Sequence, residues 1–231
     1  MENGNYATGA TIGNMVQQVK HFMTLSGQPI GLPFEQHTWG MVDLRIGLLA
    51  SEINELSDAL HDDDMNMVVD GLCDILYVAF GNMLTFIGDI DYSRGDNYLV
   101  VDKPNGKLPD YMTSHRMVKF LNEMVAFDDN MGYPITSISR YDSLIRHIMQ
   151  FSYNHGIDIV GAFNEVHESN MTKFCYDETE SCASILRYRE NDVPTYSVYN
   201  HEHQLYVIKH SMTNKVLKGL RFREPNLRPF F

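Results

Sequence analysis

The chain has 231 residues, of which 44% are hydrophobic and 21% are charged, and this balance is ordinary for one folded domain. Its 18 basic and 30 acidic side chains give a net charge of −12, which argues against nonspecific binding to duplex nucleic acid. The three cysteines fit no disulfide framework, and we see neither a signal-type N-terminus nor an uninterrupted apolar run of membrane-spanning length. We therefore expect a cytoplasmic protein without a membrane partner.

Hydrophobic side chains recur with helical periodicity in six segments: residues 12–25, 39–60, 66–86, 114–127, 141–154 and 158–170. Glycines and prolines between residues 27 and 33 predict an irregular loop after the first helix. The third segment is almost wholly apolar after Asp74, so we expect it to be the buried central helix. Ser114 is a candidate cap for the fourth helix, and Gly156 marks the end of the fifth.

Extended segments are concentrated in the C-terminal part of the chain. Residues 97–102 predict one short strand, and three alternating, aromatic-rich segments follow Lys173: residues 184–188, 195–199 and 204–210. The pattern as a whole predicts a mainly α fold, in which a helical core carries a small β-rich C-terminal appendage.

Two acidic pairs stand at helical spacing on consecutive predicted helices. Glu52 and Glu55 lie in the second helix, and Asp70 and Asp74 open the third. Because residues three or four apart share a helix face and a short turn makes the two helices antiparallel, the pairs can face one another. Four converging carboxylates suit a hard cation such as Mg²⁺ and, through it, a phosphate substrate. The alternative is that each pair belongs to the solvated face of an amphipathic helix.

Four blocks of the chain carry a family resemblance: residues 44–56, 70–81, 162–173 and 215–219. The third block ends in Ser-Asn-Met-Thr-Lys, and Pro225 and Leu227 follow the fourth. In this order the blocks resemble the all-α nucleoside triphosphate pyrophosphohydrolases, in the MazG-like branch that is close to phosphoribosyl-ATP pyrophosphohydrolases and common in phages. The resemblance implies one such domain over residues 12–231, built as a helical bundle. Because dimerisation usually completes this bundle, we expect a homo-oligomer.

The resemblance also implies an activity and a set of site residues. The expected reaction is Mg²⁺-dependent cleavage of a (deoxy)nucleoside triphosphate between the α- and β-phosphates, with Mn²⁺ as a substitute cofactor and nucleotide-pool control as the role. Carried over by position, Glu52, Glu55 and Asp74 would be metal ligands, with Asp70 a fourth ligand or the residue that positions water. The implied substrate-binding residues are Asn170, Lys173, Lys215, Lys218, Phe22 and Arg45.

Each substrate-binding role has a structural alternative. Lys215 and Lys218 could be solvated residues near the end of the chain. Asn170 could be an ordinary helix C-cap, and Phe22 could belong to the core. Arg45 could pair with a carboxylate of a neighbouring helix instead of contacting a substrate.

The chain also departs from the family pattern. Ser51 stands where the family commonly has the first of two adjacent glutamates, and Gly71 stands where it commonly has a glutamate. An insertion at about residues 89–153 and a β-rich excursion at about residues 174–214 lengthen two connections. These departures keep a rival function open, namely a protein that sequesters a nucleotide without turnover. If the chain is phage-encoded, either function would operate in the host cytoplasm.

Overall fold

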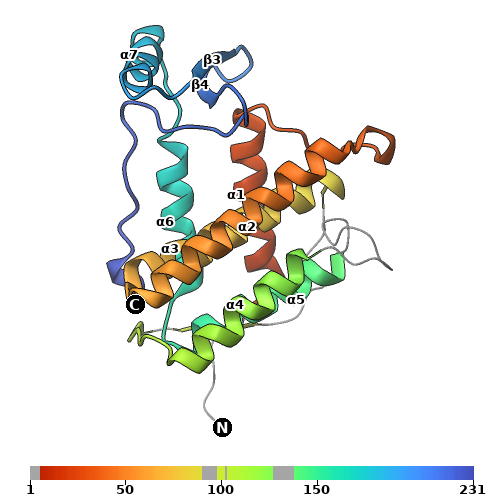
Figure 1. The fold of residues 1–231 in the computed structure, drawn as a ribbon, viewed down its shortest axis with the longest axis vertical. Helices are drawn as coiled ribbons and strands as arrows, with labels where there is room; N and C mark the ends of the chain where they lie inside the picture. Colours follow the sequence, from red (N-terminus) through yellow and green to blue (C-terminus); the bar gives the residue numbers. More distant parts are fainter. Residues whose placement is uncertain (1–5, 90–97, 102, 127–137) are drawn as a thin grey trace.

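The computed structural model describes residues 6–89, 98–101, 103–126 and 138–231, and this part of the chain is mainly helical (Figure 1). Within these ranges the α-helices are α1 (Gly9–Leu25), α2 (Trp39–His61), α3 (Met65–Phe86), α4 (Tyr111–Val125), α5 (Ile138–Asn154), α6 (Ile159–Met171) and α7 (Glu178–Arg189). Short strands form two antiparallel pairs, β1 (Tyr6–Ala7) with β2 (Tyr98–Leu99) and β3 (Thr195–Asn200) with β4 (Leu205–His210). Two short 3₁₀ turns are η1 (Phe34–Gln36) and η3 (Arg228–Phe230). The predicted mainly α class is confirmed.

Helix α3 lies at the centre of the core. Asp64 caps its first turn, because the carboxylate accepts a hydrogen bond from the backbone N–H of Met67 at 3.1 Å. The apolar residues that follow are almost all buried against α1, α2, α5 and α6. By length and composition α3 could also cross a membrane, but 78% of its most apolar window is buried inside the protein. This burial is typical of the central helix of a bundle.

Helices α2 and α3 form an antiparallel hairpin that carries both acidic pairs. The two backbones come close at Gly71, where an added Cβ would lie 3.2 Å from the Cα of Leu56. A larger side chain at this position would push the helices apart, because backbone cannot give way as a flexible side chain can. Gly71 therefore allows the close spacing of the two helices beside the acidic pairs, and any larger side chain here would require the backbone at Leu56 to shift.

Helices α4 and α5 lie in the predicted insertion and form a layer at the end of the molecule opposite the β3–β4 hairpin (Figure 1). Helix α4 packs on α2, and α5 packs on α3. The cap of α4 is Asp110, which accepts a hydrogen bond from the backbone of Thr113 at 2.7 Å, so the prediction of Ser114 as the cap is wrong. The strand predicted over residues 97–102 is limited to β2 among the described residues, and residues 97, 102 and 127 lie outside them.

The strand predicted over residues 184–188 is wrong, because these residues belong to helix α7. Asp177 caps this helix by accepting a hydrogen bond from the backbone of Glu180 at 2.7 Å. Acidic residues in the first turn and arginines in the last turn both complement the helix dipole. These end signals outweigh the short alternating pattern that favoured a strand.

The β3–β4 hairpin confirms the strands predicted over residues 195–199 and 204–210, with Val198 opposite Val207 in its register. The β-rich excursion is therefore one helix followed by one hairpin. After the hairpin the chain returns alongside α6 to the start of α3 (Figure 1). The carbonyl of Phe230 accepts a hydrogen bond from the backbone of Asp158 at 2.9 Å, which fixes the end of this return.

Candidate functional site

A cleft of about 620 Å³ opens between the α2–α3 hairpin and the β3–β4 hairpin, with α1 and the end of α6 completing its walls. Seven of the ten side chains predicted for the site line it: Phe22, Arg45, Glu52, Asp74, Asn170, Lys173 and Lys215. Glu55, Asp70 and Lys218 lie outside this lining. The fold thus brings residues from four distant segments of the chain together at one place.

Glu52 and Asp74 form the acidic wall of the cleft, one from each helix of the hairpin. Glu52 is 7% exposed and Asp74 is half-buried. Burial, then the charges of Asp74 and Glu55, raise the pKa of Glu52 to about 7. Burial also raises the pKa of Asp74, although the nearby Lys173 opposes the change. Among the described residues no side chain or backbone N–H donates a hydrogen bond to either carboxylate. One buried and one half-buried carboxylate therefore lack a hydrogen-bond partner, which is costly for the folded state.

Glu55 and Asp70 flank this wall outside the cleft. Glu55 is exposed and accepts a hydrogen bond from the Ser51 hydroxyl at 3.4 Å. Asp70 is half-buried one turn before Asp74, and burial together with the charges of Asp74 and Glu224 raises its pKa to about 7. The two pairs are thus divided: one member of each lies in the cleft and the other beside it.

Lysines stand across the cleft from the acidic wall. Lys173 follows the last turn of α6 and is half-buried, and burial lowers its pKa while Asp74 opposes that change. Lys215, after the hairpin, is exposed at the cleft. Lys209 of β4 also lines the cleft, and burial lowers its pKa as well. No motif singles out Lys209, although its place in an alternating strand could have suggested an inward side chain.

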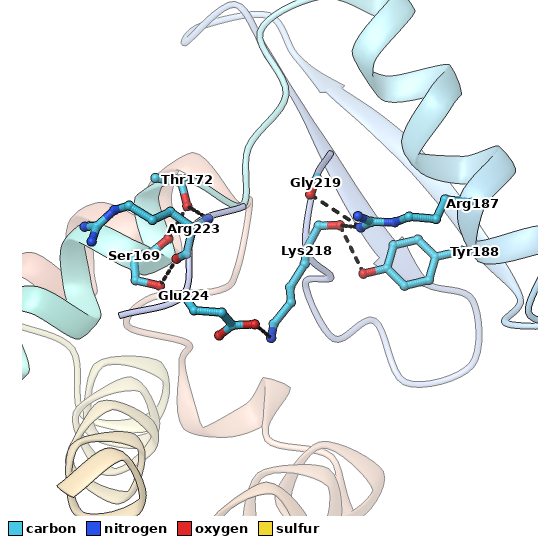
Figure 2. A network of polar contacts seen from close by, with 8 residues as sticks. All are labelled: Ser169, Thr172, Arg187, Tyr188, Lys218, Gly219, Arg223 and Glu224. Atoms are coloured by element: carbon cyan, nitrogen blue, oxygen red, sulfur yellow. Dashed lines mark hydrogen bonds and ion pairs between the residues drawn. The ribbon is translucent and has the colours of Figure 1, made fainter. Parts of the chain in front are cut away.

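Lys218 does not line the cleft, because it is engaged elsewhere (Figure 2). Its Nζ lies 2.7 Å from Glu224 Oε1 and 4.4 Å from the centre of the Phe222 ring. Its carbonyl accepts hydrogen bonds from the side chains of Arg187 at 2.8 Å and Tyr188 at 3.0 Å. The backbone of Lys218 is therefore anchored to α7, and its ammonium group is paired at the edge of the site.

Phe22 and Asn170 are both buried and both line the cleft. The Phe22 ring is buried, packs edge-on against Tyr77 with centroids 5.7 Å apart, and still lines the cleft. The Lys173 ammonium lies 6.0 Å from the centre of the same ring. Asn170 lies inside the last turn of α6, whose C-cap is Thr172, so its side chain has no capping role and faces the cleft.

The fit of the acidic wall to a metal ion can be judged from its donors. Over residues 6–89, 98–101, 103–126 and 138–231, no three Asp, Glu, His or Cys side chains converge closely enough to hold an ion as they are placed. Glu52 and Asp74 nevertheless offer hard oxygen donors without hydrogen-bond partners in the described part of the chain, and Asp74 is close enough to raise the pKa of Glu52. Two such carboxylates fit a cation such as Mg²⁺ in donor chemistry, although no third carboxylate of the described residues joins them in the cleft.

Comparison with known proteins gives one distant viral relative. Over 237 aligned residues the chain is 25% identical to an uncharacterized protein of Acanthamoeba polyphaga mimivirus, and the alignment covers 91% of this chain and 92% of that protein. No family model and no solved structure matches the chain.

Proposed function

We propose that the protein is a Mg²⁺-dependent pyrophosphohydrolase that cleaves a (deoxy)nucleoside triphosphate into a monophosphate and pyrophosphate. The observation that carries the proposal is the cleft itself, which is lined both by lysines and by two carboxylates without hydrogen-bond partners among the described residues. A cation would compensate the carboxylates, and a phosphate chain would compensate the lysines. A metal-bound triphosphate supplies both charges in one ligand.

Each group in the cleft has a defined task in this reaction. Glu52 and Asp74, with Glu55, would hold the Mg²⁺, which when bound polarises the phosphate and lowers the pKa of the attacking water. Lys173 and Lys215 bind the phosphate chain and neutralise the charge that develops on the leaving pyrophosphate. Asp70, beside the cleft, remains available to position water, as the family resemblance implies.

The burial of Glu52 affects how a metal ion would bind to the acidic wall. With its pKa at about 7, Glu52 is partly protonated at neutral pH, and a bound cation would favour its ionised form. Metal binding and proton release are then coupled, so affinity for the metal rises with pH. The ordinary solvated-face interpretation does not account for a carboxylate that is 7% exposed.

A specific observation favours one rival, a protein that binds a nucleotide and releases it unchanged. Gly71 lacks the additional carboxylate that the family commonly has, and a Cβ added there would lie tightly against Leu56 at 3.2 Å. Ser51 likewise offers a hydroxyl that is hydrogen-bonded to Glu55 in place of a glutamate. A site with fewer acids can hold a metal nucleotide without activating water.

A panel of NTPs and dNTPs, canonical and modified, incubated with Mg²⁺ or Mn²⁺ and resolved chromatographically, tests the proposal. We expect a monophosphate and pyrophosphate from at least one substrate, and no products when the metal is chelated. Release of orthophosphate, or tight binding without any product, would overturn the proposed reaction. The second outcome would establish the sequestering function.

A further inference from the structure

Arg45 is a buried cation without a counter-ion. Its side chain is 8% exposed on α2 and lines the cleft. The guanidinium carries five N–H donors, and in the described part of the chain only Gln28 Oε1 accepts from it, at 3.2 Å from Nη2. The predicted alternative, a carboxylate partner on a neighbouring helix, is not found among the described residues. The remaining donors are available to a ligand in the cleft.

Gln28 fixes the direction of this guanidinium. Its Nε2 donates to the hydroxyl of Ser26 at 3.1 Å, and that hydroxyl in turn donates to the carbonyl of Met23 at 3.2 Å. Gln28 is thereby held at both ends of its amide, in the loop that follows α1. On the α3 side, a Cβ added to Gly81 would lie 3.7 Å from Arg45 Nη1, so the guanidinium rests on bare helix backbone.

Arg45 lies some distance along α2 from Glu52, where the phosphates of the proposed substrate would bind. Arg45 and Glu52 are seven residues apart, which places them on the same face about 10.5 Å from one another along the axis. The cleft wall between them includes the apolar Leu48, with Phe22 and Tyr77 also lining the cleft. A nucleotide whose phosphates lie between Glu52 and Lys173 would extend its base toward Arg45.

Guanidinium groups favour ligands that present two adjacent acceptors in a plane. Among the nucleobases, guanine presents two such acceptors, O6 and N7, on one edge. Adenine presents the N6 amino donor in place of O6. We propose that the cleft selects nucleotides of 6-oxopurine bases, guanine or hypoxanthine, with Arg45 donating to O6 and N7 and Gln28 positioning the guanidinium. This inference rests on the proposed function, because it assigns the base of the same substrate.

Monophosphates test the inference apart from catalysis, because they are the proposed products and bind without turnover. Dissociation constants would be measured by calorimetry with Mg²⁺ for GMP, IMP, 7-deaza-GMP, AMP and CMP. We expect GMP and IMP to bind between about 5-fold and 150-fold more tightly than the other three. 7-Deaza-GMP is the decisive probe, because it differs from GMP at the N7 acceptor.

Two variants separate base recognition from phosphate recognition. Arg45→Lys keeps the charge but loses the fork, so the preference for GMP over 7-deaza-GMP should fall to about one. Lys215→Met should weaken all five ligands by a similar factor and leave their ratios unchanged. If Arg45→Lys does not fold by circular dichroism, the wild-type comparison of GMP with 7-deaza-GMP decides alone.

The outcomes distinguish this inference from the proposed reaction. Equal affinity for all five monophosphates, tighter binding of AMP or CMP, no binding at all, or a uniform loss in Arg45→Lys would overturn the base assignment. Turnover of every NTP at one rate would also overturn it while leaving the pyrophosphohydrolase intact. An Arg45-dependent preference for GMP and IMP in a protein that cleaves no triphosphate would support the base assignment and overturn the reaction.

Discussion

Two groups of carboxylates in this molecule have opposite surroundings. Glu165 of α6 accepts hydrogen bonds from the Arg223 guanidinium and from the backbone of Asn226, and these donors hold its pKa below the usual range. Glu52 and Asp74 in the cleft have raised pKa values and no donor among the described residues. The first arrangement joins the C-terminal segment to α6, and the second costs the fold stability because the ionised carboxylates lack compensating donors.

The C-terminal network shows how the fold satisfies polar groups where it has no ligand to accommodate. Ser169 Oγ donates to the carbonyl of Arg223 at 2.7 Å, and the backbone of Arg223 donates to Thr172 Oγ1 at 2.9 Å (Figure 2). Even the exposed Lys218 has a partner in Glu224. In contrast to this network, Glu52 and Asp74 have no hydrogen-bond partner among the described residues and have raised pKa values. Acids with perturbed pKa values concentrate at functional sites.

The largest expected effect is loss of turnover in Glu52→Gln. The amide keeps the size of the side chain but removes one metal ligand, so kcat/KM should fall by at least about 100-fold, because metal assistance supplies several kcal/mol to the transition state. Asp58→Asn is the matched control, since Asp58 is an exposed acid on the same helix. Steady-state kinetics on the substrate found in the panel measure both variants. Unchanged activity in Glu52→Gln would remove Glu52 from the site.

The pH dependence of stability should be the next largest effect. Because the pKa of Glu52 is about 7 in the folded protein and 4.5 as the ordinary value, the folded state binds more protons between these pH values. Stability without metal therefore falls as pH rises through this window, by up to about 3 kcal/mol for this group. Asp70, with a pKa of about 7, adds to the same trend.

Urea unfolding at several pH values, with and without Mg²⁺, measures this dependence. We expect Mg²⁺ to stabilise the protein more at pH 8 than at pH 5, because it favours the ionised carboxylates. Glu52→Gln should be more stable than the wild type at pH 8 without metal, and it should gain less from Mg²⁺. A wild-type stability that rises between pH 5 and pH 7 without metal would contradict the burial of unpartnered acids.

A smaller effect concerns the helix spacing beneath the site. Gly71→Ala would place a Cβ 3.2 Å from Leu56 Cα, and we expect a loss of about 1–3 kcal/mol from overpacking. Gly47→Ala is the control on α2, because nothing lies within 4 Å of its added Cβ and alanine is the better helix former. It should gain about 0.5–1 kcal/mol. Thermal unfolding compares the two, and a stable Gly71→Ala would mean that the helices separate freely.

Local patterns predicted most of the helices and part of the site. Glu52 and Asp74 lie on consecutive helices joined by a short turn, so helical periodicity was enough to place both on facing helices. Alternation over residues 195–199 and 204–210 was enough for the hairpin. Helix α7 was missed because a short alternating segment within it favoured a strand over its capping residue and end charges. Strand β1 was missed because it has only two residues and pairs with β2 across a long separation.

Contacts between distant segments explain the remaining differences between the predicted site and the site in the structure. Nothing near Lys218 in the sequence indicates that Glu224 and α7 hold it outside the cleft, because that arrangement depends on the path of the whole C-terminal segment. Gln28 lies in a loop with no motif, and its role follows only from its hydrogen bond to Arg45. Residue type and spacing thus named the candidate site residues, while tertiary packing decides which of them lie together.

The smallest effect expected is in the paired carboxylates, and its pH dependence has the opposite sign. The side chain of Arg223 is 47% exposed, so solvent screens the pair and Glu165→Gln should cost only about 0.5–1 kcal/mol at neutral pH. Because the pKa of Glu165 is lowered in the folded protein, its contribution is present above the usual glutamate range and is lost as pH falls. Glu168→Gln is the control, since that side chain is 72% exposed and 3.8 Å from Arg223. Urea titrations at pH 7 and pH 4 should therefore find the Glu165→Gln deficit shrinking toward acid, whereas the benefit of Glu52→Gln shrinks there because the wild-type acid is protonated. A Glu165→Gln deficit that grows toward acid would show that this carboxylate, like those in the cleft, lacks an effective partner.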